Sequence, residues 1–398
     1  MQFLILVILF ATSARVVPAL SFSPPKLLFK ALDIMTIKTS SSLPKVAIAI
    51  IGGGLIGPRH AQSIVKNLNA TLIALVDPAP HGAQVAAELK TNHYASVDVL
   101  IKSIHKPQAA IICTPNATHV PIAKELATAG INILVEKPMS TDITSGRELI
   151  AHAKACGVKL LIGHHRRFNS YISLTKSILV SPDPNTSLGR IIAISGLWTA
   201  YKPASYFAPP TEWRRGATGG VTLINLVHEI DILHHLLGPI VRVHAESTTS
   251  TRGFAASEGA AIILRFASGV VGTFVVSDAT PSPFNFEAGT GENPMIPRAG
   301  KDFYRFFGTE ASLSVPDMTR FSYDGAKEKS WTQVLAEQKV AVEDIVPFDA
   351  QVEHFVRLVR GEAEEPLCSG EDGLRALMVC EAVKEAMATG RAVDVGDV

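Results

Sequence analysis

From Lys45 onward the chain alternates short apolar runs with longer segments of helical periodicity. Val46–Ile51 is an unbroken apolar run, typical of a parallel strand that is buried on both faces. Four more strands are expected at 71–76, 109–113, 132–135 and 159–162, and the helices between them include 58–68, 120–129 and 144–156. This alternation predicts a doubly wound parallel sheet of the Rossmann type over residues 45–163.

The pattern changes after Gly163. A helix is expected at 171–179, a strand at 191–198, a long helix at 222–237, and strands at 241–247, 260–266 and 270–277. Short returns between these strands favour antiparallel pairing. Residues 280–300 hold several Pro and Gly and are expected to form a loop near the site. Two helices, 348–360 and 370–389, close the chain and can pack back on the first domain. Residues 164–398 are therefore predicted to form a second α/β domain on an open, mostly antiparallel sheet.

The first 44 residues are kept out of the predicted fold. Residues 3–11 form an apolar run that is shorter than the roughly 20 residues a membrane span requires. The run fits a signal-peptide core, and Val17-Pro18-Ala19 resembles the edge of a cleavage site, but no positive charge precedes the run. Residues 20–45 have the composition of a transit segment or linker. The alternatives are secretory or organellar targeting, or a cytoplasmic protein that starts at Met35.

Composition excludes some classes of function. The chain has 398 residues, 47% hydrophobic and 18% charged, with a formal net charge of +1 and no dense run of Lys or Arg. Nucleic acid is therefore not expected as a partner, because binding a phosphate backbone needs a concentrated basic surface. The four cysteines show no zinc-type spacing, so no metal is expected. No membrane span is expected in the mature chain.

Gly52-Gly53-Gly54-Leu55-Ile56-Gly57 matches GxGxxG directly after the first strand and before a helix. Gly52, Gly54 and Gly57 provide a tight turn, close approach of the backbone to a pyrophosphate, and close packing of helix on strand. Asp77 ends the second strand and is expected to bind the ribose hydroxyls. Its carboxylate would repel a 2′-phosphate, so the motif favours NAD over NADP, although NADP stays possible.

Two loops follow later strands of the same sheet, Thr114-Pro115-Asn116 and Glu136-Lys137-Pro138. Ligands of an open parallel sheet lie beyond the carboxyl ends of its strands, so both loops are expected to face the cofactor. Lys137 is a candidate catalytic residue, because a cation beside a reacting hydroxyl stabilises developing alkoxide charge.

The long helix of the second domain carries a stripe of polar side chains. At about 100° per residue Asn225, His228, Asp231 and His235 share one side, and apolar residues occupy the other. His234 and His235 are expected to be solvated. A neutral imidazole suits removal of a proton from an alcohol, so His228 is the candidate base.

These motifs together resemble one known family. Gly52 to His60, the Thr114-Pro115-Asn116 loop with His119, Glu136-Lys137-Pro138 and the helix with His228 and Asp231 are similar to the Gfo/Idh/MocA oxidoreductases. The resemblance implies NAD(P)-dependent oxidation or reduction of a sugar, a polyol or a related carbonyl compound. It also implies a second domain on a large open sheet that often forms the interface of a homo-oligomer. By the same resemblance Lys137 is the active-site lysine and His228 the catalytic histidine.

One position departs from the family pattern. Many members carry an aspartate four residues before the histidine, where this chain has Ile224 with Asn225 beside it. Either His228 lacks a carboxylate partner, or Asp231 orients it. Arg166, Arg167 and Trp213-Arg214-Arg215 are candidate contacts for the cofactor or for an anionic group of the substrate.

The sequence therefore predicts hydride transfer between a nicotinamide and a secondary alcohol carbon, with catalytic Lys137, His228, Asn225 and Asp231. The predicted cofactor-binding residues are Gly52, Gly54, Leu55, Ile56, Gly57, Asp77, Thr114, Pro115, Asn116, His119, Glu136, Lys137 and Arg166. One alternative is a non-catalytic, dinucleotide-sensing regulator on the same fold, which would need neither Lys137 nor His228. Another is NADP-dependent dihydrodiol or aldose oxidation, which Asp77 disfavours. Substrate and reaction direction stay open.

Overall fold

A parallel sheet of six strands is built on β1 (Val46–Ile51), whose apolar residues are almost all buried. The computed structural model describes residues 43–216 and 219–398. The strand order is β3-β2-β1-β4-β5-β6, and all neighbouring strands run parallel. The other strands are β2 (Ala70–Val76), β3 (Asn92–Tyr94), β4 (Ala109–Ile112), β5 (Asn132–Val135) and β6 (Leu160–Ile162). The predicted doubly wound sheet is confirmed. The predicted targeting segment lies outside the described residues except for Leu43 and Pro44.

Helices connect the strands of this sheet. They are α1 (Gly57–Lys66), α2 (His81–Glu88), α3 (Val97–Lys102), α4 (His119–Thr128) and α5 (Ile143–Ala155). The 3-10 turn η1 (Asn116–Thr118) precedes α4. The sequence pattern predicted α1, α4 and α5 to within about one to two residues at most ends. It did not predict α2, β3 and α3, because these elements are short and carry little periodic signal.

The second sheet has nine strands in the order β14-β13-β12-β11-β7-β10-β9-β8-β15. Its strands are β7 (Ile191–Thr199), β8 (Ile240–Ser247), β9 (Gly259–Phe266), β10 (Val271–Ser277), β11 (Tyr304–Gly308), β12 (Ala311–Val315), β13 (Thr319–Ser322), β14 (Ala336–Lys339) and β15 (Val393–Asp394). Only the β7–β10 pairing is parallel among the described strands of this sheet. The predicted large, mostly antiparallel sheet is confirmed, although β11 to β14 were not predicted individually.

The helical segments of the second part position the candidate site. They are η2 (His165–Phe168), α6 (Ser170–Leu179), η3 (Ala204–Phe207), η4 (Glu212–Arg215), η5 (Thr222–Leu226), α7 (Val227–Leu237), α8 (Phe286–Thr290), α9 (Pro347–Val359) and α10 (Gly370–Thr389). The helix predicted over 222–237 is divided, because η5 is a π-helical segment that leads into α7. Such π segments are frequent at functional sites. The loop predicted over 280–300 contains the short helix α8.

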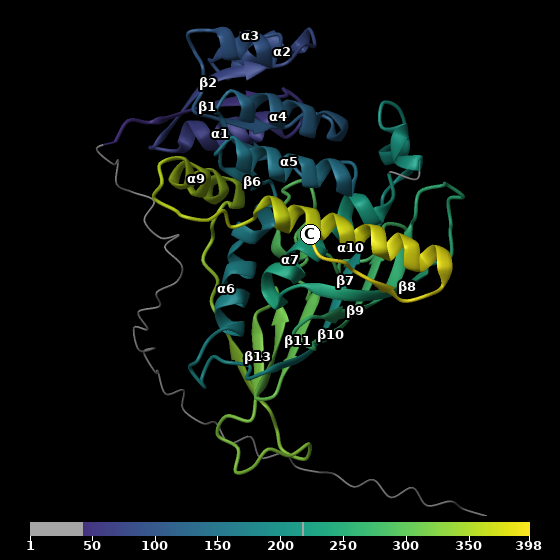
Figure 1. Ribbon diagram of the computed structural model, residues 1–398. Coiled ribbons are helices and arrows are strands. Elements are labelled where there is room, and N and C mark those ends of the chain that lie inside the picture. Colours follow the sequence, from purple (N-terminus) through teal and green to yellow (C-terminus); the bar gives the residue numbers. More distant parts are fainter. Residues whose placement is uncertain (1–42, 217–218) are drawn as a thin grey trace, which may run out of the picture. The chain divides into compact units, whose positions relative to one another are not determined.

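The last helix joins the two hydrophobic cores. Leu374 and Leu377 of α10 pack in the core of the parallel sheet, whereas Val379 and Val383 pack in the core of the second sheet. Figure 1 shows α10 in yellow between α5 and the strand β8. Its N-cap Ser369 forms a capping box with Asp372. α9 packs against α1 and η2. The closing helices therefore hold both sheets together.

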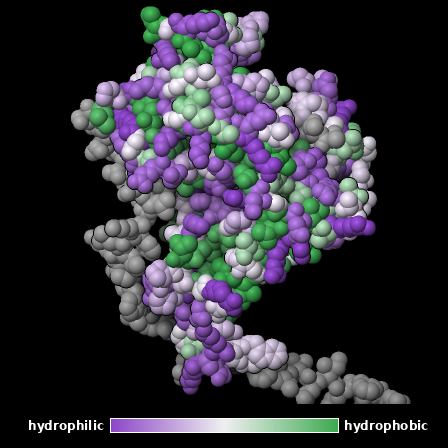
Figure 2. Space-filling model, in the orientation of Figure 1, coloured by the Kyte–Doolittle hydropathy of each residue, from purple (hydrophilic) through white to green (hydrophobic). Residues whose placement is uncertain are grey.

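The surface is mixed in polarity. On the face shown in Figure 2, hydrophobic patches are interrupted by hydrophilic residues. Within residues 43–216 and 219–398, no helix combines the length and the apolar character that crossing a membrane requires. All four cysteines have free thiols, of which Cys113, Cys368 and Cys380 are buried.

Candidate active site

The glycine-rich turn between β1 and α1 has the geometry that its spacing predicts. Gly52 has φ of +105°, and a Cβ there would lie 2.8 Å from the carbonyl oxygen of Cys113. A Cβ on Gly57 would lie 2.1 Å from the carbonyl oxygen of Gly52, so α1 approaches the turn only because no side chain intervenes. A Cβ on Gly54 would meet nothing within 4 Å. The space above Gly54 fits the close approach of a dinucleotide pyrophosphate.

The start of α1 adds to this fit. Its N-cap residue, Ile56, provides no side-chain hydrogen bond, and Leu55 before it is exposed. The first N–H groups of a helix have no acceptor within the helix, so those of α1 can bind phosphate oxygens.

Asp77 stands directly after β2 and is fixed to the glycine-rich turn. Its Oδ2 accepts a hydrogen bond of 2.7 Å from the backbone N–H of Gly53, and its Oδ1 accepts one of 2.8 Å from that of Ala79. A carboxylate has about four lone-pair sites, so acceptor capacity remains for the hydroxyls of a ribose. The carboxylate therefore lies where the sequence places it, beside the pyrophosphate turn.

The two loops at the ends of β4 and β5 are braced by one buried side chain. His119 Nδ1 lies 2.8 Å from the carbonyl oxygen of Pro138, and its Nε2 lies 2.8 Å from that of Thr114. Because both ring nitrogens are occupied in this way, His119 holds the loops in register. The predicted direct contact of His119 with the cofactor stays a prediction, and this bonding does not favour it. Thr114 is half-buried, and Asn116 in η1 is exposed.

Glu136 is a buried anion that fixes the start of the lysine loop. Its Oε1 lies 2.7 Å from Nε2 of His60, and its Oε2 accepts a bond of 3.2 Å from the backbone N–H of Lys137. Burial would raise the pKa of Glu136, but the hydrogen bond and charge of His60, with His165 and Lys137, hold it at about 2. The carboxylate is therefore ionised at neutral pH and is committed to the protein.

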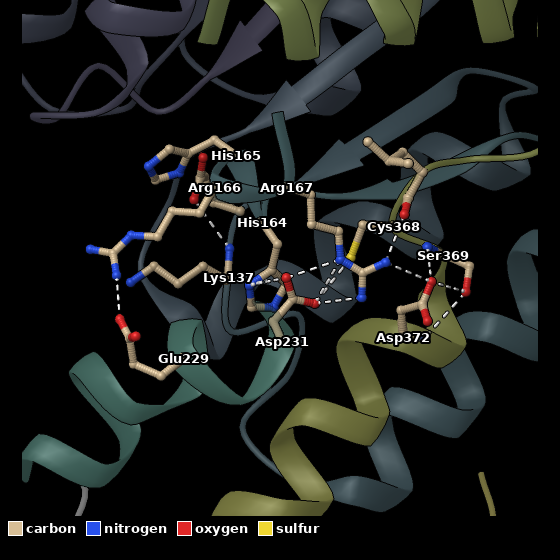
Figure 3. A network of polar contacts seen from close by, with 12 residues as sticks. Lys137, His164, His165, Arg166, Arg167, Glu229, Asp231, Cys368, Ser369 and Asp372 are labelled. Atoms are coloured by element: carbon tan, nitrogen blue, oxygen red, sulfur yellow. Dashed lines mark hydrogen bonds and ion pairs between the residues drawn. The ribbon is translucent and has the colours of Figure 1, made fainter. Parts of the chain in front are cut away.

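The side chain of Lys137 extends from this loop beside Arg166 (Figure 3). In the described part of the chain, its ammonium nitrogen forms no hydrogen bond and no ion pair. Burial lowers the pKa of Lys137, Glu136 opposes this, Arg166 lowers the pKa further, and Glu287 and Glu292 raise it. The ammonium therefore keeps its donors available for a substrate oxygen.

His228 lies at the second position of α7 and is buried. Its Nδ1 makes no hydrogen bond with any described residue. Burial lowers the pKa of His228 well below its usual value, and the positive charges of Lys137, Arg166, His165 and His164 lower it further. The rings of His164 and His165 each have their centroids 5.9 Å from that of His228. The imidazole is therefore neutral, as a proton acceptor requires.

Three carboxylates surround the guanidinium of Arg166. Its Nη1 donates to Glu229 Oε1 at 2.7 Å, its Nη2 donates to Glu287 Oε1 at 2.5 Å, and its Nε lies 3.2 Å from Glu292 Oε2. The Tyr304 hydroxyl also donates to Glu229, and the Trp198 indole N–H donates to Glu287 at 2.8 Å. The predicted contact of Arg166 with the cofactor or an anionic substrate group stays a prediction, which this pairing does not favour.

Arg167 points to the opposite side from Arg166 (Figure 3). Its Nη2 donates to Asp231 Oδ1 at 2.7 Å, and its Nη1 donates to the carbonyl oxygen of Leu367 at 2.7 Å. Nη1 also lies 3.3 Å from Asp372 in the first turn of α10. Asp231 is completely buried in this pair. Asp231 thus pairs with Arg167, which favours the alternative in which His228 lacks a carboxylate partner; the predicted catalytic role of Asp231 stays a prediction.

Asn225 accepts a hydrogen bond from a lysine in the segment that follows β7. Its Oδ1 accepts a hydrogen bond of 2.6 Å from Nζ of Lys202, which also lies 3.3 Å from Asp278 Oδ2. Burial lowers the pKa of Lys202, and Asp278 opposes this. Asn225 thus occupies the helix position beside Ile224, and its Oδ1 is already engaged by a cation. Its predicted catalytic role stays a prediction.

The cations of the predicted 213–215 cluster stabilise their own segment. The Arg214 guanidinium lies 3.8 Å from the centroid of the Tyr206 ring, and its Nη1 donates to the Tyr206 carbonyl oxygen at 3.0 Å. Arg215 Nε donates to the carbonyl oxygen of Phe207 at 2.7 Å. Their predicted contact with a ligand stays a prediction.

The expectation that His234 is solvated is wrong, and that for His235 holds only in part. His234 is only 8% exposed, neither of its ring nitrogens has a described partner, and His235 is half-buried. The reason is that α7 packs on several sides, against α6, α10 and η2. A polar position on such a helix does not imply contact with water.

Sequence reasoning missed several charged groups of the site. His164 and His165 follow β6 at the carboxyl edge of the parallel sheet, a position that could have identified them. Glu229 directly follows His228, but its spacing carried no signal. The other two groups, Glu287 and Glu292, lie in the segment expected to be a loop near the site.

Comparison with known families agrees with this geometry. The model of the oxidoreductase family with an NAD-binding Rossmann fold, Gfo/Idh/MocA, matches residues 46–164, and the model of its C-terminal α/β domain matches residues 184–395. The chain belongs to the Gfo/Idh/MocA family. The predicted family, the oxidoreductase class and the NAD-binding fold are confirmed, and the comparisons give no support to a non-catalytic regulator.

Individual relatives of this Gfo/Idh/MocA protein are distant but extend over most of its length. Inositol 2-dehydrogenase of Rhizobium meliloti is 23% identical and covers 88% of this chain and 99% of its own. The structure of the WlbA dehydrogenase of Bordetella pertussis, in complex with NADH and UDP-GlcNAcA, has a TM-score of 0.67 at 22% identity and covers 88% and 99% of the two chains. An oxidoreductase of Agrobacterium radiobacter, in complex with NAD+, L-tartaric acid and magnesium, has a TM-score of 0.72 at 16% identity and covers 88% and 99%.

The buried histidines predict loss of stability in acid. Burial lowers the pKa of His164 to about 4 and that of His234 to about 3, so between these values and 6.5 the unfolded chain binds more protons than the fold. Stability is therefore fully present above about pH 6.5 and falls by about 1.4 kcal/mol per pH unit for each such histidine below it. We expect His234→Leu to make the free energy of unfolding, measured in urea at pH 7 and pH 5, less dependent on pH.

The exposed His105 provides the matched control for this experiment. His105→Leu is expected to retain the full decline between pH 7 and pH 5. An equal decline in the two variants would remove His234 from the acid response.

Proposed function

We propose that this protein transfers a hydride between NAD and a secondary alcohol carbon of a sugar, a polyol or a similar small molecule. The observation that carries the proposal is the pairing of an unengaged ammonium, Lys137, with a buried neutral imidazole, His228, at the carboxyl edge of the parallel sheet. The name of the Rhizobium meliloti relative, inositol 2-dehydrogenase, supports a polyol substrate.

The residues of this chain account for the proton and for the charge of the reaction. NAD, when bound, supplies the nicotinamide ring that takes up the hydride. In the direction of oxidation, Lys137 Nζ donates a hydrogen bond to the reacting oxygen and stabilises its developing negative charge. His228 takes the hydroxyl proton on the ring nitrogen that carries its lone pair. The reverse reaction uses the same two groups with the opposite proton movement.

We assign cofactor binding and substrate binding to different parts of the chain. Residues 45–163 bind the cofactor, residues 164–398 bind the substrate, and α9 and α10 return to the parallel sheet. The assignment of residues 1–44 to secretory or organellar targeting rests on their sequence pattern, with a start at Met35 as the alternative.

The cofactor assignment follows the geometry at the carboxyl edge. The backbone of Gly52, Gly54, Leu55, Ile56 and Gly57 receives the pyrophosphate, and Asp77 receives the ribose. The other cofactor contacts that the sequence predicts lie in or next to the loops at the ends of β4, β5 and β6, namely Thr114, Pro115, Asn116, His119, Glu136, Lys137 and Arg166. Of these, His119, Glu136 and Arg166 have protein partners, so we assign direct contact to Thr114, Pro115, Asn116 and Lys137.

A substrate panel tests the proposed function directly. Purified full-length protein is mixed with inositols, aldoses and other polyols in the presence of NAD or NADP, and the absorbance of the reduced cofactor is followed. We expect reduction of NAD with at least one polyol or sugar. Absence of cofactor reduction across the panel, together with absence of NAD binding in calorimetry, would reject the proposal.

Replacement of the unengaged lysine tests the chemistry. Lys137→Met should lower kcat by about 10²–10³-fold, the usual loss when one donor to a developing oxyanion is removed. The affinity for NAD should change little, because the substitution leaves the glycine-rich turn and Asp77 intact. Steady-state kinetics and calorimetry measure the two quantities. Lys106→Met, at an exposed position, is the control, and equal turnover in the two variants would exclude Lys137 from the chemistry.

The carboxylate after β2 predicts cofactor preference. In Asp77→Asn the charge that repels a 2′-phosphate is removed, while Oδ1 can still accept a backbone hydrogen bond. We expect the ratio of kcat/KM with NAD to kcat/KM with NADP to fall by at least about tenfold, equivalent to about 1.4 kcal/mol. An unchanged ratio would show that Asp77 does not contact the ribose.

We also propose that the open face of the second sheet pairs with a second copy of the chain. The face carries apolar side chains in adjacent strands: Ile263 is 51% exposed, Phe307 41%, Val275 38% and Val271 37%. Their register places Val271 and Phe307 opposite Ala193, in one row across β10, β7 and β11. A contiguous apolar surface of this kind is typical of an interface between proteins.

A charge on this face tests the interface. Ile263→Asp, in the middle of β9, should convert the oligomer into monomers, because an unpaired carboxylate cannot be buried at low cost. Light scattering coupled to size exclusion gives the mass in solution. Val99→Asp is the control, since Val99 is 49% exposed on α3, away from this sheet. A monomeric wild-type protein, or an Ile263→Asp variant that stays oligomeric, would contradict the proposal.

A further inference from the structure

Three carboxylates surround the single positive charge of Arg166. Each nitrogen of the guanidinium faces a different carboxylate, those of Glu229, Glu287 and Glu292. The guanidinium also lies over the ring of Phe286, 4.3 Å from its centroid. Because three carboxylates surround its single positive charge, Arg166 offers little net attraction for a carboxylate or phosphate of the substrate.

Burial and neighbouring charges act differently on the pKa values of Glu229 and Glu292. Burial raises the pKa of Glu229 to about 7, and Arg166 and Tyr304 only partly oppose this. Burial would also raise the pKa of Glu292, but His165 and Arg166 lower it to about 2. Glu292 therefore carries a full negative charge at neutral pH, whereas burial disfavours the charged form of Glu229. An ionised carboxylate is a strong acceptor for hydroxyl hydrogens.

Two of these carboxylates lie near the reacting groups. Glu287 and Glu292 both act electrostatically on Lys137, and Glu287 also acts on Lys202. Glu287 contacts Arg166, which lies beside Lys137, and it also contacts Trp198, whose ring lies under the ammonium of Lys202. Each of its oxygens accepts one bond, from Arg166 and from Trp198, and so keeps capacity for another.

The ammonium of Lys202 already has partners in the protein. Lys202 donates to Asn225, and its ammonium is paired with Asp278. Among the cations described here next to the reacting groups, Lys137 alone keeps its ammonium unengaged, and its charge is required for the reacting oxygen. A negatively charged group on the substrate would thus meet carboxylates rather than an available cation.

From this arrangement we infer that the site takes an uncharged polyol and that Glu287 and Glu292 bind its hydroxyl groups. A carboxylate or phosphate on the ring that reacts is rejected by the same two residues. The inference rests on the proposed function, which it narrows from sugars and polyols in general to neutral ones. Sugars that carry an acid group or a nucleotide are the competing class.

Pairs of substrates that differ only in charge test the inference on the wild-type protein. Suitable pairs are myo-inositol with myo-inositol 1-phosphate, and glucose with glucuronate, together with UDP-N-acetylglucosamine as a nucleotide sugar. In any pair of which at least one member reacts, we expect kcat/KM for the neutral member to exceed kcat/KM for the charged member at least tenfold. Equal or higher kcat/KM for a charged member would overturn the inference and leave the proposed function intact. No cofactor reduction with any of them would instead count against the proposed function.

Removal of one charge tests the residues themselves. Glu292→Gln keeps the shape of the side chain but frees one side of Arg166, so KM for the neutral polyol should rise several-fold while NAD affinity stays unchanged. The ratio of kcat/KM between the neutral and the charged member of a pair should fall at least fivefold. Glu287→Gln should act in the same direction. Glu88→Gln, at an exposed position on α2 where Glu88 bonds only Gln84, is the control and should leave both quantities unchanged.

The expected rise in KM and fall in the kcat/KM ratio can be distinguished from a loss of folding. Thermal denaturation and NAD titration of each variant establish that the site is intact, and Glu292→Asp should recover part of the discrimination because it restores the charge. If the glutamine variants lower kcat/KM for both members of a pair by the same factor, the carboxylates stabilise the site but do not select the substrate, and the inference is wrong. If a variant does not fold, the substrate pairs on the wild-type protein decide the question.

Discussion

The burial of two adjacent arginines, Arg166 and Arg167, is the constraint on which the site depends. A buried guanidinium needs a carboxylate partner, and removal of one partner from such a pair typically costs about 3–5 kcal/mol. The two side chains point in opposite directions from η2, and each takes a carboxylate from the first turns of α7, Glu229 for Arg166 and Asp231 for Arg167. His228 directly precedes Glu229 on α7, the helix that both ion pairs fix to η2. The position of the imidazole is therefore set by two ion pairs that it does not itself make.

The same pair of arginines connects distant parts of the chain. Arg167 reaches the carbonyl oxygen of Leu367 and Asp372 at the start of α10, the helix that contributes to both cores. Arg166 reaches α8 and the segment after it. One short turn at the end of the parallel sheet thus joins α7, α8 and α10. Lys137, one strand away, needs no partner of its own because its surroundings are held rigid by others.

The sequence was sufficient for those parts of the site that depend on local backbone geometry. The turn at Gly52 to Gly57 and the carboxylate of Asp77 are close in sequence to the strands that position them, and their spacing alone predicts the arrangement. The parallel sheet was predictable for the same reason, since its strands are unbroken apolar runs. Strands β11 to β14 were missed because polar residues interrupt these short segments, whereas the equally short β4 and β5 are mostly apolar.

The parts that could not be predicted depend on packing in three dimensions. The prediction of a polar stripe over 225–235 assumed a regular helix with one solvent-exposed face. In the structure η5 is π-helical, which changes the angle between Asn225 and His228, and α7 is buried on several sides, which encloses His234. Asp231 shares the helix with His228 but faces Arg167, a partner 64 positions away in sequence. Glu287 and Glu292 join the site through their ion pairs with Arg166, and no local sequence pattern identifies them as site residues.

The absence of an aspartate at Ile224 fits the charges that surround His228. A carboxylate beside the ring would favour its protonated form, whereas the groups with the largest effects on His228 here are burial and the cations Lys137 and Arg166, which favour the neutral form. In the proposed reaction a neutral imidazole would accept the substrate proton but hold it weakly, so Lys137 would stabilise the charge of the alkoxide. The carboxylates of Glu229, Glu287 and Glu292 lie around Arg166 instead. In the binding mode inferred above, the oxygens of Glu287 and Glu292 contact the part of the substrate that does not react.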